Sequence, residues 1–297
     1  MDEHRGTGNV VESAPNGLAR GTLYVVATPI GHMDDVTLRA LEVLRHADAV
    51  LAEDTRHTRA LLSRHGISAE LYSLHEHNER SRVAEVKARL EQGHRLALVS
   101  DAGTPLISDP GFVLVRALTR GGFPVVPIPG PSAFVAALSV AGLPTDRFVF
   151  EGFLPARRSA RRRRLEGLCN ETRTLVLYES PRRLGDLLDD AAAVLGGGRE
   201  VTVARELTKI HESLHIGTLG ELTDAVTAGD VPERGEIVVC IAGADERAEA
   251  ALALELEPLL SALLTEMPVK RAVEIACELT GLKRNAVYEL ALSLKSD

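Results

Sequence analysis

From residue 22 onward, short apolar runs rich in β-branched residues alternate with longer stretches of helical periodicity. The runs are typical of buried strands and lie at Thr22–Ala27, Ala49–Ala52, Leu96–Ser100 and Pro124–Ile128. The helical stretches lie at Val36–His46, Thr58–His65, Pro110–Arg120 and Pro131–Ala141. Because parallel strands must be joined by crossovers, usually helices, this alternation predicts an α/β domain with a mostly parallel sheet covered on both faces.

A second strand-rich series follows a joint at Gly142–Asp146. Its strand candidates are Phe148–Gly152, Thr174–Tyr178, Val201–Ala204, Ser213–Ile216 and Ile237–Ile241, with helices at Pro181–Val194 and Leu219–Ala228. Residues 246–295 lack strand signals and are predicted to form an alanine- and leucine-rich helix followed by two more helices, Val269–Leu279 and Arg284–Leu294, which Gly281 separates. This pair has helix-turn-helix spacing, although simple core-packing helices would look the same. The predicted organisation is a tail at 1–20, α/β domains at 21–144 and 145–244, and a helical extension at 245–297.

Two features of the sequence bear on the compartment. No apolar run approaches the roughly 20 residues of a membrane helix, and the first twenty residues contain no apolar block typical of a secretory signal. We interpret those twenty residues as a disordered tail. The three cysteines, Cys169, Cys240 and Cys277, are far apart in sequence, as expected of buried thiols in a reducing compartment. We therefore expect a cytoplasmic protein without a membrane partner.

The charge of the chain is unevenly distributed. The formal net charge is −8, which argues against broad, nonspecific binding to nucleic acid. One segment nevertheless concentrates six arginines, Arg157, Arg158, Arg161, Arg162, Arg163 and Arg164, with no acidic residue between Glu151 and Glu166. A solvated helix face usually mixes in acids, so this patch predicts a local contact with a polyanion such as RNA.

Three loops that follow strand candidates are rich in glycine and proline. They read TPIGHMDD at Thr28–Asp35, SDAGTP at Ser100–Pro105 and IPGPSA at Ile128–Ala133. In a parallel sheet such loops converge at one edge, where ligands bind. Asp101 and Ser132 place polar groups at that edge, although Asp101 could instead cap a helix. No loop matches the dinucleotide fingerprint G-x-G-x-x-G or the phosphate-binding G-x-x-x-x-G-K-[ST], so both of those sites are unsupported.

Taken in order, a longer series of segments resembles one known family. The segments are ATPIGHMDD, AEDTRHT, SDAGTPLISDPG, IPGPSA, GFLPA, LYESPRRL, ARELTKIHE and GEIVVCIAG. They are similar to the ribosomal RNA small-subunit methyltransferase I family of the tetrapyrrole-methylase-like superfamily. The resemblance runs from Gly21 to about Gly243 and continues more weakly through VKRAVEIACELTGLKRNAVYELAL. One departure is His32, where the family usually has asparagine.

The resemblance implies a fold, a cofactor and a reaction. It implies two α/β domains with S-adenosylmethionine in the cleft between them, and a homodimer. It implies 2′-O-methylation of a cytidine in the decoding region of 16S rRNA, presented as free rRNA or as the small ribosomal subunit. No metal is expected, because the sulfonium of the cofactor is already an activated leaving group.

The family pattern also implies which residues bind the cofactor. Pro29 and Gly31 are expected to shape the acceptor end of the pocket. The remaining cofactor-binding candidates are Ser100, Asp101, Ala102, Gly103, Thr104, Pro105, Pro129, Gly130, Ser132, Ala133, Leu154, Tyr178, Glu179, Ser180, Ala204, Arg205, Glu206 and Leu207.

A ribose hydroxyl is a weak acid, so a base or a cation near the acceptor would assist the transfer. Lys209, in the segment ARELTK, is one candidate. A lysine desolvated beside Arg205 could act as a neutral base, or it could remain charged and hold a phosphate. Asp54 and Arg56 are rivals for the base and RNA-positioning roles. Plain surface ion pairs, Asp54 with Arg56 or Glu206 with Lys209, are the alternative.

Three other functions stay open on the sequence. A carbon methyltransferase acting on a tetrapyrrole would need no arginine patch, and its first loop typically reads G-x-G-x-x-D where this chain has Pro29–Asp34. A non-catalytic RNA-binding assembly factor is the second alternative, and a cofactor titration would distinguish it from an enzyme. An unrelated α/β enzyme is the third alternative.

Overall fold

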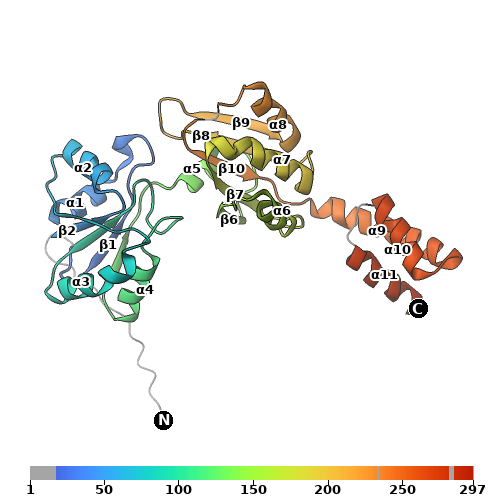
Figure 1. Ribbon diagram of the computed structural model, residues 1–297, viewed down its shortest axis with the longest axis horizontal. Coiled ribbons are helices and arrows are strands. Elements are labelled where there is room, and N and C mark those ends of the chain that lie inside the picture. The colour runs from blue at the N-terminus through green and yellow to red at the C-terminus, as the bar shows by residue number, and fades with distance from the viewer. Residues whose placement is uncertain (1–17, 233, 281–283, 297) are drawn as a thin grey trace, which may run out of the picture. The chain divides into compact units, whose positions relative to one another are not determined.

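In this computed structural model the described residues are 18–232, 234–280 and 284–296 (Figure 1). Contacts divide the chain into a unit that holds both sheets, up to Ala242, and a unit formed by residues 170–172 and 243–297. Most of the predicted tail and the predicted helix end at Gly281 lie outside the described residues. The tail prediction is wrong for Leu18 and Ala19, because both are buried and the Tyr24 hydroxyl donates to the Ala19 carbonyl at 3.3 Å.

The first sheet is parallel throughout, as predicted. Its strand order is β3-β2-β4-β1-β5, with β1 at Leu23–Val26, β2 at Ala49–Ala52, β3 at Leu71–Ser73, β4 at Leu96–Val99 and β5 at Val125–Ile128. The connecting elements are η1 (Met33–Asp35), α1 (Leu38–His46), α2 (Thr55–Arg64), α3 (Glu79–Glu91) and α4 (Phe112–Arg120). Strand β3 and helix α3 were not predicted.

Alternate residues of these strands enter two separate cores, because successive side chains of a strand point to opposite faces. On one face Val26, Val50 and Val99 pack with buried residues of α1 and α2. On the other face Leu23 and Leu96 pack with buried residues of α3 and α4. Both faces are therefore covered, and the ligand-accessible part of this sheet is its edge.

The second sheet is mixed. Its order is β6-β7-β10-β8-β9, with β6 at Phe148–Phe153, β7 at Thr174–Glu179, β8 at Glu200–Arg205, β9 at Ser213–Thr218 and β10 at Ile237–Ile241. Only β6 and β7 pair in parallel, and β10 runs antiparallel to both of its neighbours. Its helices are α6 (Arg158–Glu166), η2 (Pro181–Arg183), α7 (Leu184–Leu195) and α8 (Leu219–Ala228).

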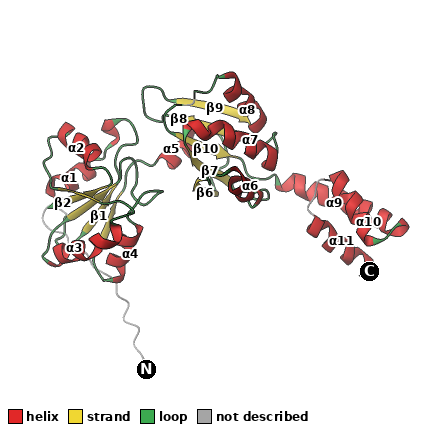
Figure 2. Cartoon of the chain, in the orientation of Figure 1, coloured by secondary structure: helices red, strands yellow, loops and turns green. Residues whose placement is uncertain are grey.

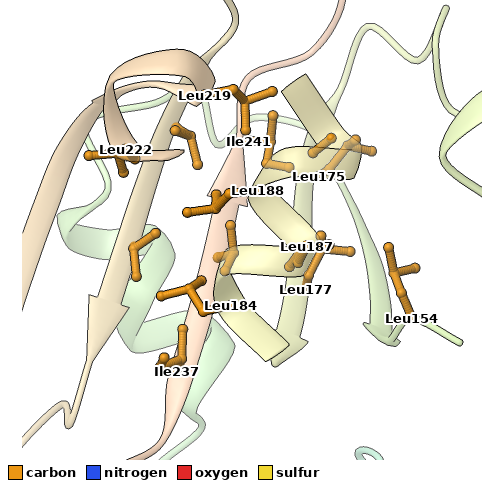
Figure 3. Packing of buried hydrophobic residues seen from close by; sticks show 14 of the residues in the cluster. Leu154, Leu175, Leu177, Leu184, Leu187, Leu188, Leu219, Leu222, Ile237 and Ile241 are labelled. Atoms are coloured by element: carbon orange, nitrogen blue, oxygen red, sulfur yellow. The ribbon is translucent and has the colours of Figure 1, made fainter. Parts of the chain in front are cut away.

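Leucine and isoleucine side chains fill one face of the second sheet (Figure 3). Leu175 and Leu177 of β7 and Ile237 and Ile241 of β10 pack with α7 and α8, in a cluster that also contains Leu165 of α6. Helix α8 begins with a capping box, in which Thr218 and Glu221 satisfy each other's backbone N–H groups.

The opposite face of the second sheet is covered by α5 (Ala133–Val140). Its Ala137 and Leu138 pack with Val176 of β7 and Cys240 of β10. Because α5 follows the last strand of the first sheet, the predicted boundary at residue 144 places it in the first domain. Its sequence, AFVAALSV, is apolar except for Ser139, so the helix is stable only where a second apolar surface is available.

The C-terminal unit is helical (Figure 2). It contains α9 (Glu246–Glu266), α10 (Val269–Thr280) and α11 (Arg284–Ser296). Leu260, Val273 and Val287, one from each helix, are fully buried in a core of their own. None of the helices in the described parts of the chain has the length and apolar character needed to span a membrane. The three cysteines are unpaired, and Cys240 is buried in the second sheet.

Candidate active site

The glycine- and proline-rich loops of the first sheet are hydrogen-bonded to one another. Thr28 and Gly103 exchange backbone hydrogen bonds of 2.9 and 3.1 Å, and the Thr104 hydroxyl donates to the Pro131 carbonyl at 3.0 Å. Gly103 has φ of +81°, which favours glycine. A Cβ on Gly130 would lie 2.9 Å from the Cβ of Ala27. The loops that follow β1, β4 and β5 therefore form one hydrogen-bonded rim at the carboxyl edge of the sheet.

Backbone strain is concentrated beside this rim. Among the described non-glycine residues, positive φ occurs at Leu106, Ser108, Glu206 and Thr208. The first two lie in the loop after β4, and the other two lie in the loop after β8. Such conformations cost free energy and persist where the surrounding structure fixes them, which is common at functional sites.

A pocket of about 420 Å³ lies between these loops and the strand ends of the second sheet. This volume is within the range of small-molecule sites. Its lining is mostly apolar and includes the aromatic rings of Phe153 and Tyr178. Five carboxylate residues also line it: Glu53, Asp101, Asp109, Glu179 and Glu236. Within the described residues no lysine, arginine or histidine lines this pocket, so it suits a ligand that carries positive charge.

Asp109 is the most perturbed of these acids. Burial raises the pKa of its carboxyl to about 6, against a hydrogen bond from Ser100 that lowers it, and the neighbouring charges of Glu53 and Asp101 raise it further. Burial, followed by the charge of Asp101, also raises the pKa of Glu53. Carboxyl groups with raised pKa in a pocket mark a candidate functional site.

A smaller pocket of about 260 Å³ adjoins the first. The two pockets share four residues, namely Ile30, Asp101, Ala102 and Glu236. We call these four residues the common wall. The rest of the smaller pocket is formed by Thr28, Pro29, Gly31, Met33, His57, Thr58, Ala60, Leu61, Ser100 and Lys209. Two ligands bound in these pockets would therefore meet at the common wall.

Lys209 lies at the smaller pocket but is held by two carboxylates. Its Nζ is 3.0 Å from Glu206 Oε1 and 3.1 Å from Glu236 Oε2. Partial burial lowers the pKa of Lys209, but the bonds and charges of these two glutamates outweigh burial and raise it overall. The prediction of a neutral lysine base is therefore wrong, and a charged Lys209 is the alternative that remains. Arg205, its supposed neighbour, donates instead to the carbonyls of Arg234 and His211.

Asp54 forms the N-cap of α2, where it accepts a hydrogen bond from the Arg56 N–H. Both of its carboxylate oxygens also bond the Arg56 guanidinium, with a shortest distance of 2.6 Å. These bonds hold the pKa of Asp54 far below its usual range. The structure thus contains the alternative, an ion pair of Asp54 with Arg56, and Asp54 lines none of the three pockets; its base role stays a prediction.

Most of the predicted cofactor residues come together. Those lining the larger pocket are Asp101, Ala102, Gly103, Thr104, Ser132, Ala133, Tyr178, Glu179, Ser180, Ala204 and Leu207. Pro29, Gly31 and Ser100 line the smaller one, and Glu206 lines an open neighbouring pocket with Lys209 and Arg64. Pro105, Pro129, Gly130, Leu154 and Arg205 line none of the three. Leu154 belongs to the core under α7. Arg205 is buried, and its guanidinium donates hydrogen bonds to backbone carbonyls.

Several lining residues escaped prediction. Asp109 and Glu53 lie in the quoted motifs SDAGTPLISDPG and AEDTRHT, each of which follows a strand of the first sheet. This position after a strand could have predicted that both residues line the pocket. Gly235 and Glu236 precede β10 instead of following a strand. They reach the pocket because β10 is antiparallel to β7 and β8, so its beginning lies where those strands end.

The arginine patch differs from its prediction. Arg161 is only 1% exposed, and its guanidinium lies 2.8 Å from Asp190 of α7, which is itself fully buried. Arg158 and Arg162 pair with the same carboxylate at 2.9 and 3.5 Å. Arg164 pairs with Glu151 at 2.6 Å. A phosphate-binding role for Arg161 is therefore wrong, because acids distant in sequence neutralise and bury it.

Metal-ligating side chains do not cluster in the described residues: no group of three or more His, Cys, Asp or Glu could hold an ion.

Comparison with known proteins gives the class first. The model of the Tetrapyrrole (Corrin/Porphyrin) Methylases matches residues 22–223. A uroporphyrin-III-C-methyltransferase from Thermus thermophilus superimposes with a TM-score of 0.52 at 22% identity, covering 75% of this chain and 94% of that one. The cobalt precorrin-4 methyltransferase CbiF gives 0.57 at 20% identity, covering 79% and 98%. The fold is that of the tetrapyrrole methylases.

Sequence relatives identify the family. The ribosomal RNA small subunit methyltransferase I of Escherichia coli O157:H7 is 50% identical over 95% of this chain and 97% of its own length. The protein of that name from Pseudomonas aeruginosa is 49% identical over 93% and 98%. The model of the RsmI C-terminal HTH domain matches residues 250–295. The chain belongs to the ribosomal RNA small subunit methyltransferase I family.

Proposed function

We propose that this protein transfers the methyl group of S-adenosylmethionine to the ribose 2′-hydroxyl of a cytidine in the decoding region of 16S rRNA. The observation that carries this proposal is the pair of pockets with a common wall, of which the larger is lined by carboxylates and by no cationic side chain in the described residues. The names of the relatives supply the substrate class.

The residues of the larger pocket fit this cofactor. When bound, S-adenosylmethionine supplies a methyl group activated by a positively charged sulfur. The carboxylates of the lining would favour the sulfonium and ammonium charges and could accept hydrogen bonds from ribose hydroxyls. Phe153 and Tyr178 offer apolar surface to a planar base. The smaller pocket, across the common wall, would receive the acceptor ribose, with Pro29 and Gly31 in its lining.

Methyl transfer from radiolabelled cofactor into unmodified small-subunit rRNA, followed by mapping of the modified nucleotide, tests the proposal. We expect one methylated ribose in the decoding region, with transfer unaffected by a metal chelator. Free rRNA and assembled small subunits should be compared as acceptors. Label on a base, label on a supplied porphyrinogen, or no cofactor binding by calorimetry would contradict it.

The raised pKa of Asp109 predicts that cofactor affinity depends on pH. Above about pH 6 this side chain is ionised, and its added negative charge should strengthen the binding of a cation. A water-screened charge pair contributes about 1 kcal/mol, which corresponds to about fivefold in affinity between pH 5 and pH 7.5. Calorimetric titrations at both pH values check this prediction. Asp109→Asn should bind with nearly the same affinity at the two pH values; an unchanged pH dependence in that variant would exclude Asp109 as its source.

For the RNA contact we propose the members of the arginine patch that remain available. Arg157 and Arg163 are exposed, and neither has an ion-pair partner among the described residues. Changing both to alanine should weaken RNA binding and reduce the slope of log K against log salt by up to about one unit per lost phosphate contact. Arg120→Ala, an exposed arginine at the end of α4, is the matched control. Equal salt slopes for all three proteins would show that the patch does not contact RNA.

We further propose a cytoplasmic homodimer. The edge strands of the second sheet support self-association, because they expose apolar side chains away from the pockets: Phe148 on β6 and Ile216 on β9. Exposed apolar residues on sheet edges are typical of association surfaces.

A further inference from the structure

Donor and acceptor atoms must come within about 3–3.5 Å for methyl transfer. On the proposed function, the acceptor hydroxyl therefore loses its proton beside the common wall, where the two pockets meet. Ile30 and Ala102 have no side-chain group that accepts a proton. The wall offers two groups that do, the carboxylates of Asp101 and Glu236.

Glu236 is already engaged. Its Oε2 lies 3.1 Å from Lys209 Nζ, and its backbone N–H donates to Glu206 Oε1 at 2.8 Å. Taking a proton would remove the charge that helps to hold Lys209 in the smaller pocket. Glu53 and Asp109 line the larger pocket only, so they face the cofactor side of the wall.

Asp101 is positioned without being neutralised. Its Oδ1 accepts the backbone N–H of Asp54 at 2.9 Å, and its own N–H donates to the Glu53 carboxylate. No ion pair to Asp101 and no hydrogen bond to its Oδ2 is present within the described residues. The N-terminal end of α2 thus fixes one oxygen of Asp101, and the second oxygen is available to a ligand.

Resting on the function proposed above, we propose that Asp101 is a catalytic residue, the general base that receives the proton of the acceptor ribose hydroxyl. As the hydroxyl oxygen forms its bond to the methyl carbon, the carbon–sulfur bond breaks and leaves its electron pair on sulfur. The hydroxyl proton passes to Asp101 Oδ2. One positive charge on sulfur and one negative charge on the carboxylate are lost together, so the products are a methyl ether, a neutral thioether and a carboxylic acid.

Asp101→Asn tests this assignment, because asparagine can still accept the Asp54 N–H through its amide oxygen but cannot take up the proton. The measurement is the single-turnover rate of methyl transfer into unmodified small-subunit rRNA, with cofactor and RNA both at saturating concentration. We expect a rate at least about 100-fold below wild type, as is usual for the loss of a general base. Asp101→Glu, which keeps a carboxylate, should recover part of the lost rate.

Asp101 also lines the larger pocket, so its substitution could weaken cofactor binding. Measuring the rate at saturating cofactor separates the proposed role as a base from such an effect on binding. A variant whose rate returns to within tenfold of wild type at saturating cofactor, or one that no longer binds cofactor, would overturn the assignment. Asp224→Asn, an exposed aspartate of α8 that lines none of the pockets, should keep the wild-type rate. If the wild-type protein itself transferred no methyl group to RNA, the proposed function would fail; if only the Asp101→Asn prediction failed, that function would stand.

Discussion

Replacing Asp190 with alanine is expected to lower the free energy of unfolding by about 3–5 kcal/mol, the usual cost of removing one partner of a buried ion pair. The reason is the burial of Arg161, which is 1% exposed and has Asp190 as its nearest carboxylate at 2.8 Å. Without Asp190 that guanidinium keeps only Asp186, at 3.6 Å and largely exposed to solvent. Denaturant titration followed by circular dichroism gives the free energy directly.

Asp189→Ala is the matched control, because it changes the adjacent residue of α7, which is exposed. We expect it to change the free energy of unfolding by no more than about 0.5 kcal/mol, as is common for surface substitutions. A loss below about 1 kcal/mol in Asp190→Ala would mean that Arg161 readily finds solvent or another acid. The description of the arginine patch as mainly structural would then need revision.

Gly31→Ala is expected to reduce the methyl-transfer rate by about 100-fold. A Cβ at this position would lie 2.5 Å from Lys209 Cγ, 2.7 Å from Thr208 Oγ1 and 3.0 Å from the Leu207 carbonyl oxygen. Because a backbone atom is among the three, rotation of side chains cannot relieve the crowding, and the two loops must separate. A displacement of about 1 Å between loops that position reactants can cost 100-fold in rate.

The rate of the Gly31→Ala variant should be compared with that of Gly198→Ala, whose added Cβ meets no atom within 4 Å. The control is expected to retain the wild-type rate. Since the His32 N–H donates to Thr208 Oγ1 at 3.0 Å, the two loops are bonded as well as packed. Equal rates for both variants would show that the close approach at Gly31 has no part in forming the site.

The sequence predicted every strand of the described residues except β3, and the predicted ones include the edge strands β5, β6 and β9. Strand β3 was missed since it has three half-buried residues, Leu71–Ser73. Helix α3 was missed because its sequence, ERSRVAEVKARLE, is polar with little periodicity, and only Val86 and Leu90 among its apolar residues are buried. Short or polar elements depend on tertiary contacts, which a local pattern does not contain.

At the candidate site, prediction succeeded where position along a parallel strand determines position in space. Asp101, Thr104 and Ser132 were placed correctly at one pocket for that reason. It failed where a partner comes from a distant part of the chain. Asp190 follows Arg161 by 29 residues, and Glu236 follows Lys209 by a similar separation. Neither pairing has a sequence signal, so Arg161 was predicted to contact RNA, and for Lys209 only the pair with the nearby Glu206 was considered.

The packing of α5 has a consequence for dividing the chain. A cut at Gly142–Asp146 would leave the first fragment with an apolar helix in water and would strip the second sheet of the cover over Val176 and Cys240. Both fragments would then expose apolar surfaces to water and should aggregate when they are produced separately. A cut before Ser132 instead keeps α5 with the sheet that it covers, although it opens the loop that follows β5. A fragment that carries the second sheet should therefore begin before α5, one helix earlier than the boundary that the sequence predicts at Gly142–Asp146.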